Sequence, residues 1–180
     1  DTPSGTVATT SEEPFVPPLR LTGPVVFAAA PHRYRTTVEL DCTPDALFDV
    51  FEDADAWPVW VRAIRSVTWT SPLPPREGTT RDVEMVGGVV LRERFTAYER
   101  GRHMQFVFTD MPGGALDGAG EDYRVTDLGD GRCRLDWTMV MVPAPGLAGR
   151  AMGVTAWTTG PLLRSMARDL QRYVRDRVLV

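Results

Sequence analysis

The feature that most constrains the fold is a series of six short segments in which apolar and polar residues alternate. Turn-forming runs such as PLPPREG, PGGALDG and GDG separate them. Alternation with a period of two is typical of half-buried strands, because successive side chains point to opposite faces of a sheet. Short connections predict an antiparallel meander. The six segments lie near 65–71, 78–86, 89–99, 102–110, 119–128 and 131–142.

A seventh strand and a helix are predicted before this meander. The run RYRTTVELDC at 33–42 alternates in the same way. Thr43 and Pro44 then carry the N-cap and first-turn signals of a helix. Apolar residues on one face predict that this helix continues to about Asp53.

A second short helix is predicted next, in the stretch DAWPVWVRAI that begins at Asp55 and ends at Ile64. Asp55 is its expected cap and Pro58 lies in its first turn, where a missing N–H is tolerated. Trp57 and Trp60 flank the proline. Two readings stay open. Large rings at helical spacing are usually core residues, which favours both rings in the core. So short a helix is not expected to bury both fully, which favours one ring at the edge of a binding site.

The two ends of the chain differ in character. Residues 1–24 are rich in Pro, Thr, Ser and Gly, and VVFAAA at 25–30 suits either an added strand or a packed extension. We therefore expect a flexible or surface-draped arm over 1–30 and one domain over 31–180. Near the other end, apolar residues recur every three or four positions after Gly160 and Pro161, which predicts a long amphipathic helix.

Composition excludes several classes of function. The formal charge is −4 and no basic run is present, so nucleic acid is not an expected partner. No apolar run approaches the roughly 20 residues of a membrane span, and we expect a cytoplasmic protein without membrane insertion. All 20 basic residues are Arg, which excludes a Schiff-base lysine. No phosphate-binding loop, nucleophile elbow or metal-ligand spacing is found, so neither a cofactor nor a metal is expected.

The order of these elements resembles the START/SRPBCC helix-grip superfamily, in particular its polyketide cyclase/dehydrase branch. The resemblance covers about 33–178 and is carried by FEDADAWPVWVRAIRSV, REGTTRDVEM, LRERFTAYERGRHMQFVF and YRVTDLGDGRCRLDWTM. It implies an α+β helix-grip fold: a seven-stranded bent antiparallel sheet around a long C-terminal helix, with two short helices after the first strand. It also implies a deep, mostly apolar cavity, and that Cys42 and Cys133 are close neighbours. No shared catalytic residues come with it.

Strand alternation selects the side chains that face this cavity. In the strand 102–110, Phe106 and Phe108 share the apolar face and His103 lies on the other, which predicts an exposed histidine. The same reasoning on the other strands, with the two helices, gives the full set of candidate ligand-binding residues: Trp57, Trp60, Val83, Met85, Leu91, Phe95, Phe106, Phe108, Trp137, Met139, Trp157 and Met166.

Charged residues interrupt the apolar face of the hairpin at 78–98. A three-residue loop with a glycine bulge aligns its two apolar faces, and places Glu93 inward, opposite Val83. Arg81 is then diagonal to Glu93 and opposite Phe95. The pair is either a structural ion pair or a polar anchor for a ligand carbonyl or hydroxyl. Glu93, Arg81 and Tyr123 are the candidate catalytic residues.

The function predicted from this set is binding of a hydrophobic, polyketide-like or aromatic small molecule, with cofactor-free cyclisation or dehydration in secondary metabolism as the candidate reaction. The alternative is a non-enzymatic carrier, lipid-transfer or self-resistance sequestering protein. An interaction module with an incidental pocket is a third reading. Monomer and homodimer both stay open.

Overall fold

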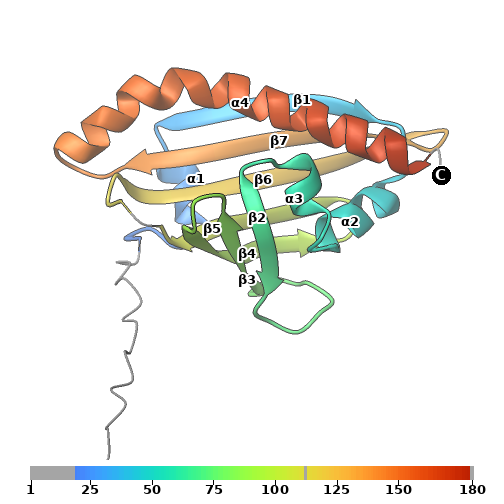
Figure 1. Cartoon of the computed structure of the whole chain (residues 1–180), viewed down its shortest axis with the longest axis horizontal. Helices are drawn as coiled ribbons and strands as arrows, with labels where there is room; N and C mark the ends of the chain where they lie inside the picture. The colour runs from blue at the N-terminus through green and yellow to red at the C-terminus, as the bar shows by residue number, and fades with distance from the viewer. Residues whose placement is uncertain (1–18, 112, 179–180) are drawn as a thin grey trace, which may run out of the picture.

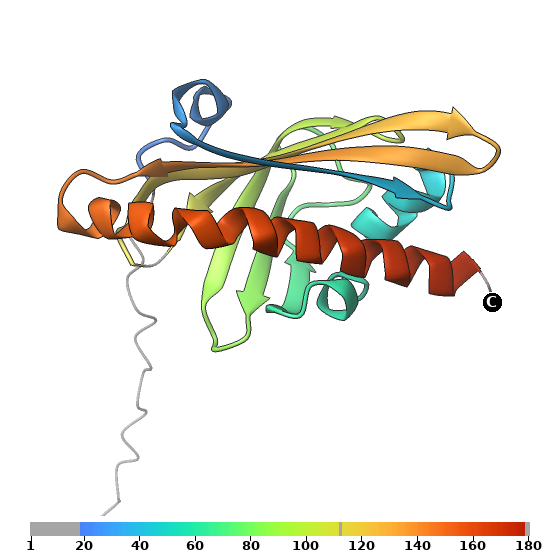
Figure 2. The same ribbon diagram turned by 90° about the horizontal axis from the view of Figure 1, so that it is seen from above.

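A bent seven-stranded antiparallel sheet forms the body of the protein, and the long helix α4 (Leu147–Val178) lies along it (Figures 1 and 2). The computed structural model describes residues 19–111 and 113–178. The strands follow the order β1-β7-β6-β5-β4-β3-β2, so β2 to β7 form the predicted meander and β1 pairs with β7. The strands are β1 (His32–Leu40), β2 (Ile64–Trp69), β3 (Thr80–Met85), β4 (Val90–Glu99), β5 (His103–Asp110), β6 (Leu116–Gly129) and β7 (Arg132–Pro143).

Every predicted strand is present, and its ends lie within three residues of the expected ones. Burial alternates along β1 and β7 as the sequence pattern requires. Cys42, just after β1, and Cys133 in β7 are the expected neighbours: both are buried and free, with their sulfurs 4.0 Å apart.

The two short helices are found, but the second is shorter than predicted. In α2 (Pro44–Glu52) the Thr43 hydroxyl accepts a hydrogen bond from the backbone of Ala46, as expected of an N-cap. The helix α3 comprises only Trp57–Trp60, and its N-cap is Ala56 rather than Asp55. The predicted continuation to Ile64 is wrong because that residue begins β2 and pairs with β3, so sheet hydrogen bonds replace further helical turns.

The final helix begins earlier than the sequence suggested. Gly160 and Pro161 were expected to mark its start, but α4 is already helical from Leu147 and continues through the proline. Pro161 has no N–H for the carbonyl of Trp157, so the helix forgoes one hydrogen bond there. The second half of α4 buries Leu163 and other apolar residues against the sheet.

The described part of the arm packs on the outer face of the sheet. VVFAAA forms the helix α1 (Val25–Ala29), which is the packed extension and not an added strand. Val26 is fully buried there against Val107 and Val140. Leu19, by contrast, is buried in the main core, and its backbone N–H donates to the carbonyl of Thr109. Residues 1–18 of the predicted arm lie outside the described residues.

The hairpin β3–β4 has the predicted odd-length loop but a different register. The loop residues are Val86, Gly87 and Gly88, because the backbone of Met85 donates to the carbonyl of Val89. The loop thus begins one residue earlier than expected, which moves every cross-strand partner by two.

The shift in register corrects two predicted pairings. Val83 lies opposite Leu91, and not opposite Glu93. Arg81 lies directly opposite Glu93, and not opposite Phe95. The faces themselves are as predicted, so both charged side chains point into the interior, now as direct cross-strand partners.

The contact between α1 and the sheet predicts the effect of a substitution at Gly120. A methyl group at this position would lie 2.8 Å from the carbonyl oxygen of Phe106 and 2.9 Å from the ring of Phe27. Gly120→Ala is therefore expected to lower the free energy of unfolding by about 1–3 kcal/mol, measured by urea denaturation. The control is Gly23→Ala, where no heavy atom lies within 4 Å. Equal stability of the two variants would contradict this account of the packing.

Candidate functional site

A cavity of about 480 Å³ lies between the sheet and α4. This is within the size range of small-molecule sites. Five polar residues reach it: Glu93 and Glu121 from the sheet, and Arg62, Ser165 and Asp169 from the side of α3 and α4. The rest of the lining is apolar and rich in methionine: Val61, Ala63, Ile64, Val83, Met85, Leu91, Phe108, Met111, Ala119, Met139, Met141, Leu162 and Met166.

Half of the predicted ligand-binding residues belong to this lining. They are Val83, Met85, Leu91, Phe108, Met139 and Met166. Their contact with a ligand stays a prediction, but the geometry brings them together around one hollow.

The other predicted wall residues lie elsewhere. Five are aromatic side chains buried in the core near α2 and α3: Trp57, Trp60, Phe95, Phe106 and Trp137. The sixth, Trp157, is on α4 and 75% exposed. Alternation identified the correct face for the strand residues, but rings fill one part of the interior and leave the other part open.

Both tryptophans of α3 are buried, against the expectation that so short a helix could not bury two rings. Trp57 is 3% and Trp60 1% exposed, and their ring centroids are 4.8 Å apart. The indole N–H of Trp57 donates to the carbonyl of Phe51 in α2, and Trp60 meets Trp137 edge to face. The helix is flanked by α2 and the sheet, so rings on both sides of it find partners.

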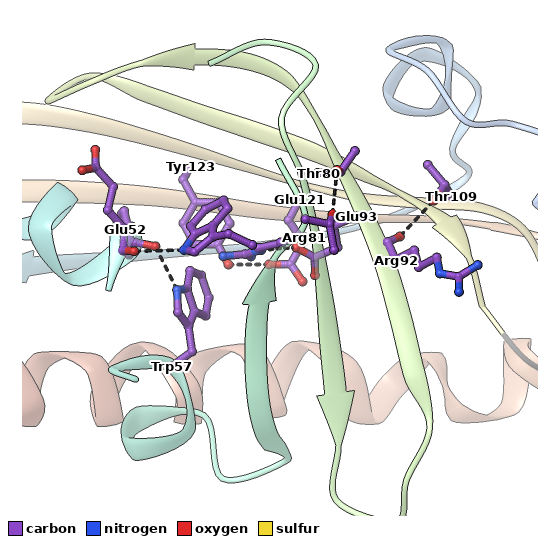
Figure 3. Close-up of polar contacts among 12 residues, drawn as sticks. Glu52, Trp57, Thr80, Arg81, Arg92, Glu93, Thr109, Glu121 and Tyr123 are labelled. Atoms are coloured by element: carbon purple, nitrogen blue, oxygen red, sulfur yellow. Dashed lines mark hydrogen bonds and ion pairs between the residues drawn. The ribbon is translucent and has the colours of Figure 1, made fainter. Parts of the chain in front are cut away.

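Arg81 and Glu93 form a buried ion pair (Figure 3). Glu93 and the similarly buried Glu121 line one end of the cavity, its inner end. The guanidinium Nε donates to Oε2 of Glu93 at 2.6 Å, and the two side chains are 1% and 5% exposed. The guanidinium carbon also lies 4.2 Å from the ring centroid of Trp57 and 4.9 Å from that of Phe106. Burial raises the pKa of Glu93, and the charge and hydrogen bond of Arg81 oppose that rise.

A second buried carboxyl, that of Glu121, lies beside this pair and was missed by the sequence analysis. Its Oε2 accepts hydrogen bonds from the Tyr123 hydroxyl and, at 2.9 Å, from the indole N–H of Trp137. Figure 3 shows Glu121 and Tyr123 close to Arg81 and Glu93. The signal was available, because Glu121 precedes Tyr123 by two residues in β6 and therefore shares its face.

The environment of Glu121 favours its protonated form. Burial is the largest cause and raises its pKa to about 7; the nearby charge of Glu93 adds to the rise, and the hydrogen bonds from Tyr123 and Trp137 oppose it. Burial also keeps the pKa of Tyr123 well above its ordinary value, so the phenol stays a donor. One guanidinium thus faces two carboxyls, of which one can take up or release a proton near neutral pH.

Two predicted catalytic residues do not reach the cavity themselves. Arg81 and Tyr123 stand behind the lining, where they hold the carboxyls of Glu93 and Glu121. His103 is on the outer face of the sheet as predicted, but it is only partly exposed, with Nε2 2.6 Å from a carboxylate oxygen of Asp122. Its place on that face separates it from the cavity.

Comparison with solved structures assigns the fold. The aromatase/cyclase Zhui from Streptomyces sp. R1128 aligns with 81% of this chain and 94% of its own, at 14% identity and a TM-score of 0.66. A START superfamily protein from Mycobacterium smegmatis aligns with 81% of this chain and 98% of its own, at 18% identity and a TM-score of 0.60. At such identities the likeness concerns the fold, which is the START/SRPBCC helix-grip fold.

The sequence itself assigns the family. Residues 31–175 match the family described as polyketide cyclase / dehydrase and lipid transport, and the chain belongs to it. The uncharacterized proteins Rv2574 of Mycobacterium tuberculosis and Mb2604 of Mycobacterium bovis are each 44% identical over 148 residues, which is 82% of this chain and 87% of theirs. Across the described part of the chain, no helix has the length and apolar character needed to cross a membrane.

Glu121 makes the stability of the protein depend on pH. In the unfolded chain its carboxyl ionises near its ordinary pKa of 4.5, whereas in the folded protein it keeps its proton until about pH 7. The folded state therefore binds more protons between these values, and the free energy of unfolding falls as the pH rises through this window. The contribution of this group is about 3 kcal/mol.

Glu121→Gln removes the ionisation and keeps a carbonyl oxygen for Tyr123 and Trp137. Urea unfolding at about pH 5 and about pH 8 should show the variant gaining about 3 kcal/mol relative to the wild type at the higher pH. Glu84→Gln, the same change at a partly exposed outer position, is the control and should show no comparable gain. If the free energies of unfolding of wild type and Glu121→Gln differ by the same amount at both pH values, the raised pKa of Glu121 is contradicted.

Proposed function

We propose that the protein binds a hydrophobic, polyketide-like or aromatic small molecule in this cavity and catalyses its cyclisation or dehydration without a cofactor. One observation carries the proposal: an apolar cavity ends at two buried carboxyls in different environments, one paired with Arg81 and the other hydrogen-bonded by Tyr123 and Trp137. Membership of the polyketide cyclase / dehydrase and lipid transport family supports it.

The chemistry follows from the different environments of the two carboxyls. The guanidinium of Arg81 favours the carboxylate form of Glu93 and opposes the burial that raises its pKa, whereas no cation is hydrogen-bonded to Glu121, whose pKa is raised to about 7. A carboxylate and a carboxylic acid side by side can act as general base and general acid. In a dehydration, the base removes the proton next to a ligand carbonyl, the acid protonates the departing hydroxyl, and one molecule of water leaves as the double bond forms.

A carrier without catalytic activity is the second candidate, and one observation favours it. Oε2 of each carboxyl accepts hydrogen bonds from Arg81 or from Tyr123 and Trp137, as in a structural network that fixes the shape of the cavity. The "lipid transport" in the family description is compatible with such a role. In a carrier, the ligand is recovered unchanged after tight binding.

Filling the cavity tests the shared premise of both candidates. Ala119 is 1% exposed and lines the cavity, so Ala119→Leu should insert three carbons into it. Binding of the neutral dye Nile red, followed by its fluorescence, is expected to weaken about tenfold or more because the binding space shrinks. Ala28→Leu, at an exposed position of α1, is the control and should bind the dye as the wild type does. Unchanged binding in Ala119→Leu would place the dye elsewhere.

A dehydration assay separates enzyme from carrier. The probe is a naphthyl β-hydroxyketone, whose loss of water yields an enone with strong ultraviolet absorbance. An enzyme should accelerate this reaction, and Glu121→Gln should lower kcat by about 100-fold or more because the amide cannot donate the proton. The matched Glu84→Gln should retain full activity. A probe that binds but is recovered intact with the wild type would support the carrier and contradict the enzyme.

A further inference from the structure

The inner end of the cavity presents hydrogen-bond acceptors to a ligand. Glu93 and Glu121 are its deeply buried polar residues, 5% and 7% exposed. Arg81 and Tyr123 engage one oxygen of each, Oε2. Within residues 19–111 and 113–178, no hydrogen bond reaches the other oxygen, Oε1, of either carboxyl. Two carboxyl oxygens therefore remain for whatever occupies the cavity: Oε1 of Glu93, and Oε1 of Glu121, which is an acceptor once that carboxyl is ionised.

Three neighbouring donors are used by these same carboxyls, and the two buried donors without a partner among the described residues, Nη1 of Arg81 and the indole N–H of Trp60, belong to side chains outside the lining. The Tyr123 hydroxyl and the indole N–H of Trp137 both donate to Oε2 of Glu121. Arg81 donates through Nε to Glu93, is 1% exposed and does not line the cavity. Although its Nη1 lacks a hydrogen-bond partner among the described residues, its guanidinium lies among aromatic rings on the far side of the carboxyls. A ligand anion that reaches the inner end of the cavity therefore meets carboxyls before it meets the guanidinium of Arg81.

The remaining polar groups of the lining do not offset the excess of carboxyls over cations at the inner end. Arg62 is exposed, and Asp169, whose carboxylate is 2.6 Å from Arg172, lines the same side of the cavity. Charges exposed to solvent interact weakly because water and salt screen them. Ser165 carries no charge. The buried end, where electrostatic interactions are strongest, holds two carboxyls against one guanidinium.

We infer that the cavity selects a ligand whose innermost polar group donates hydrogen bonds, a hydroxyl or an ammonium, and rejects ligands that end in a carboxylate. This inference rests on the proposed binding role of the cavity and adds the chemical class of its ligand. Once Glu121 is ionised, a donor satisfies the two open acceptor oxygens, whereas a carboxylate is repelled by Glu93 and Glu121 and leaves them without partners. Fatty-acid anions are thereby excluded as ligands, while alcohols, phenols and amines with an apolar body are accepted.

The selection is expected to sharpen as the pH rises. Glu121 is the group that titrates, and the groups facing it are Arg81 from β3, Glu93 from β4 and Tyr123 from its own strand, with Asp169 of α4 across the cavity. Above about pH 7 the ionisation of Glu121 adds one negative charge to the inner end, which favours a cation and disfavours an anion.

Three matched probes test the inference: naphthylethanol, naphthylethylamine and naphthylacetate, which share one ring system and differ in the terminal group. Affinities are measured by displacement of Nile red at about pH 6 and about pH 8. At the higher pH the alcohol and the amine should each bind at least about tenfold tighter than the carboxylate. The ratio of amine to carboxylate affinity should increase by several-fold between the two pH values.

Variants identify the groups responsible. Glu121→Gln should abolish the pH dependence of the amine to carboxylate ratio and reduce that ratio, because the amide is uncharged at both pH values. Glu93→Gln leaves Arg81 without its counter-charge and should improve binding of naphthylacetate by about tenfold. Thermal melting verifies that each variant is folded. Glu93→Gln removes half of a buried ion pair and can unfold the protein. In that case the amine to carboxylate ratio of Glu121→Gln alone tests the inference.

The outcomes separate this inference from the proposed function. Binding of all three probes with equal affinity would overturn the selectivity and leave the binding cavity intact. Binding of the carboxylate that is lost in Arg62→Ala would place that probe at the arginine of the lining and would overturn the exclusion of carboxylates from the cavity. Failure of every probe and of Nile red to bind would overturn the proposed function, and the inference with it.

Discussion

The ion pair between Arg81 and Glu93 determines how the interior of the protein is organised. The two side chains are directly opposite each other on neighbouring strands and almost fully buried. A buried charge is tolerated only when it is paired, so neither side chain can be accommodated without the other. The rings of Trp57 and Phe106 surround the guanidinium and use the favourable interaction between a cation and aromatic faces. The pair therefore forms a fixed polar point around which apolar side chains must be arranged.

Glu121 gives this polar point an excess of carboxyl groups. A single guanidinium cannot neutralise two carboxylates, and burial penalises the charged form of each. The result is that Glu121 is the group whose protonation changes near neutral pH. Tyr123 and Trp137 hold it in one orientation through hydrogen bonds to the same oxygen. A buried carboxyl with this degree of support is suited to proton transfer, and equally to fixing the orientation of a ligand.

The sequence predicted the architecture well because its signals are local. Alternation fixes strands, glycine-containing turns fix hairpins, and Thr43 and Pro44 fix the start of α2. The prediction was less accurate where the outcome depends on a choice between close alternatives. The loop at Gly87 and Gly88 tolerates two three-residue arrangements that differ by one position, and only pairing along the whole of β3 and β4 selects between them.

The candidate site was predicted only in part, for a physical reason. Alternation tells which face of a strand a residue occupies, but not what lies across the interior from it. Phe106 and Phe108 share one face of β5, yet Phe106 contacts the aromatic core while Phe108 lines the cavity. Glu121 does not fit the apolar pattern of its face, so apolar alternation alone does not select it. An inward acidic residue in an otherwise apolar alternation was the signal, as it had been for Glu93.

The interior is thus divided into an aromatic part that is filled and a methionine-rich part that is open. The carboxyls of Glu93 and Glu121 lie at the boundary, supported from the aromatic side by Arg81, Tyr123 and Trp137. Such support makes one side of the site rigid, whereas flexible methionine side chains on the other side can adapt to a ligand. If apolar side chains filled the cavity, two carboxyl oxygens would be buried without hydrogen-bond partners, at a cost of about 1–3 kcal/mol or more each. The open cavity avoids that cost because its occupant can form hydrogen bonds with these oxygens.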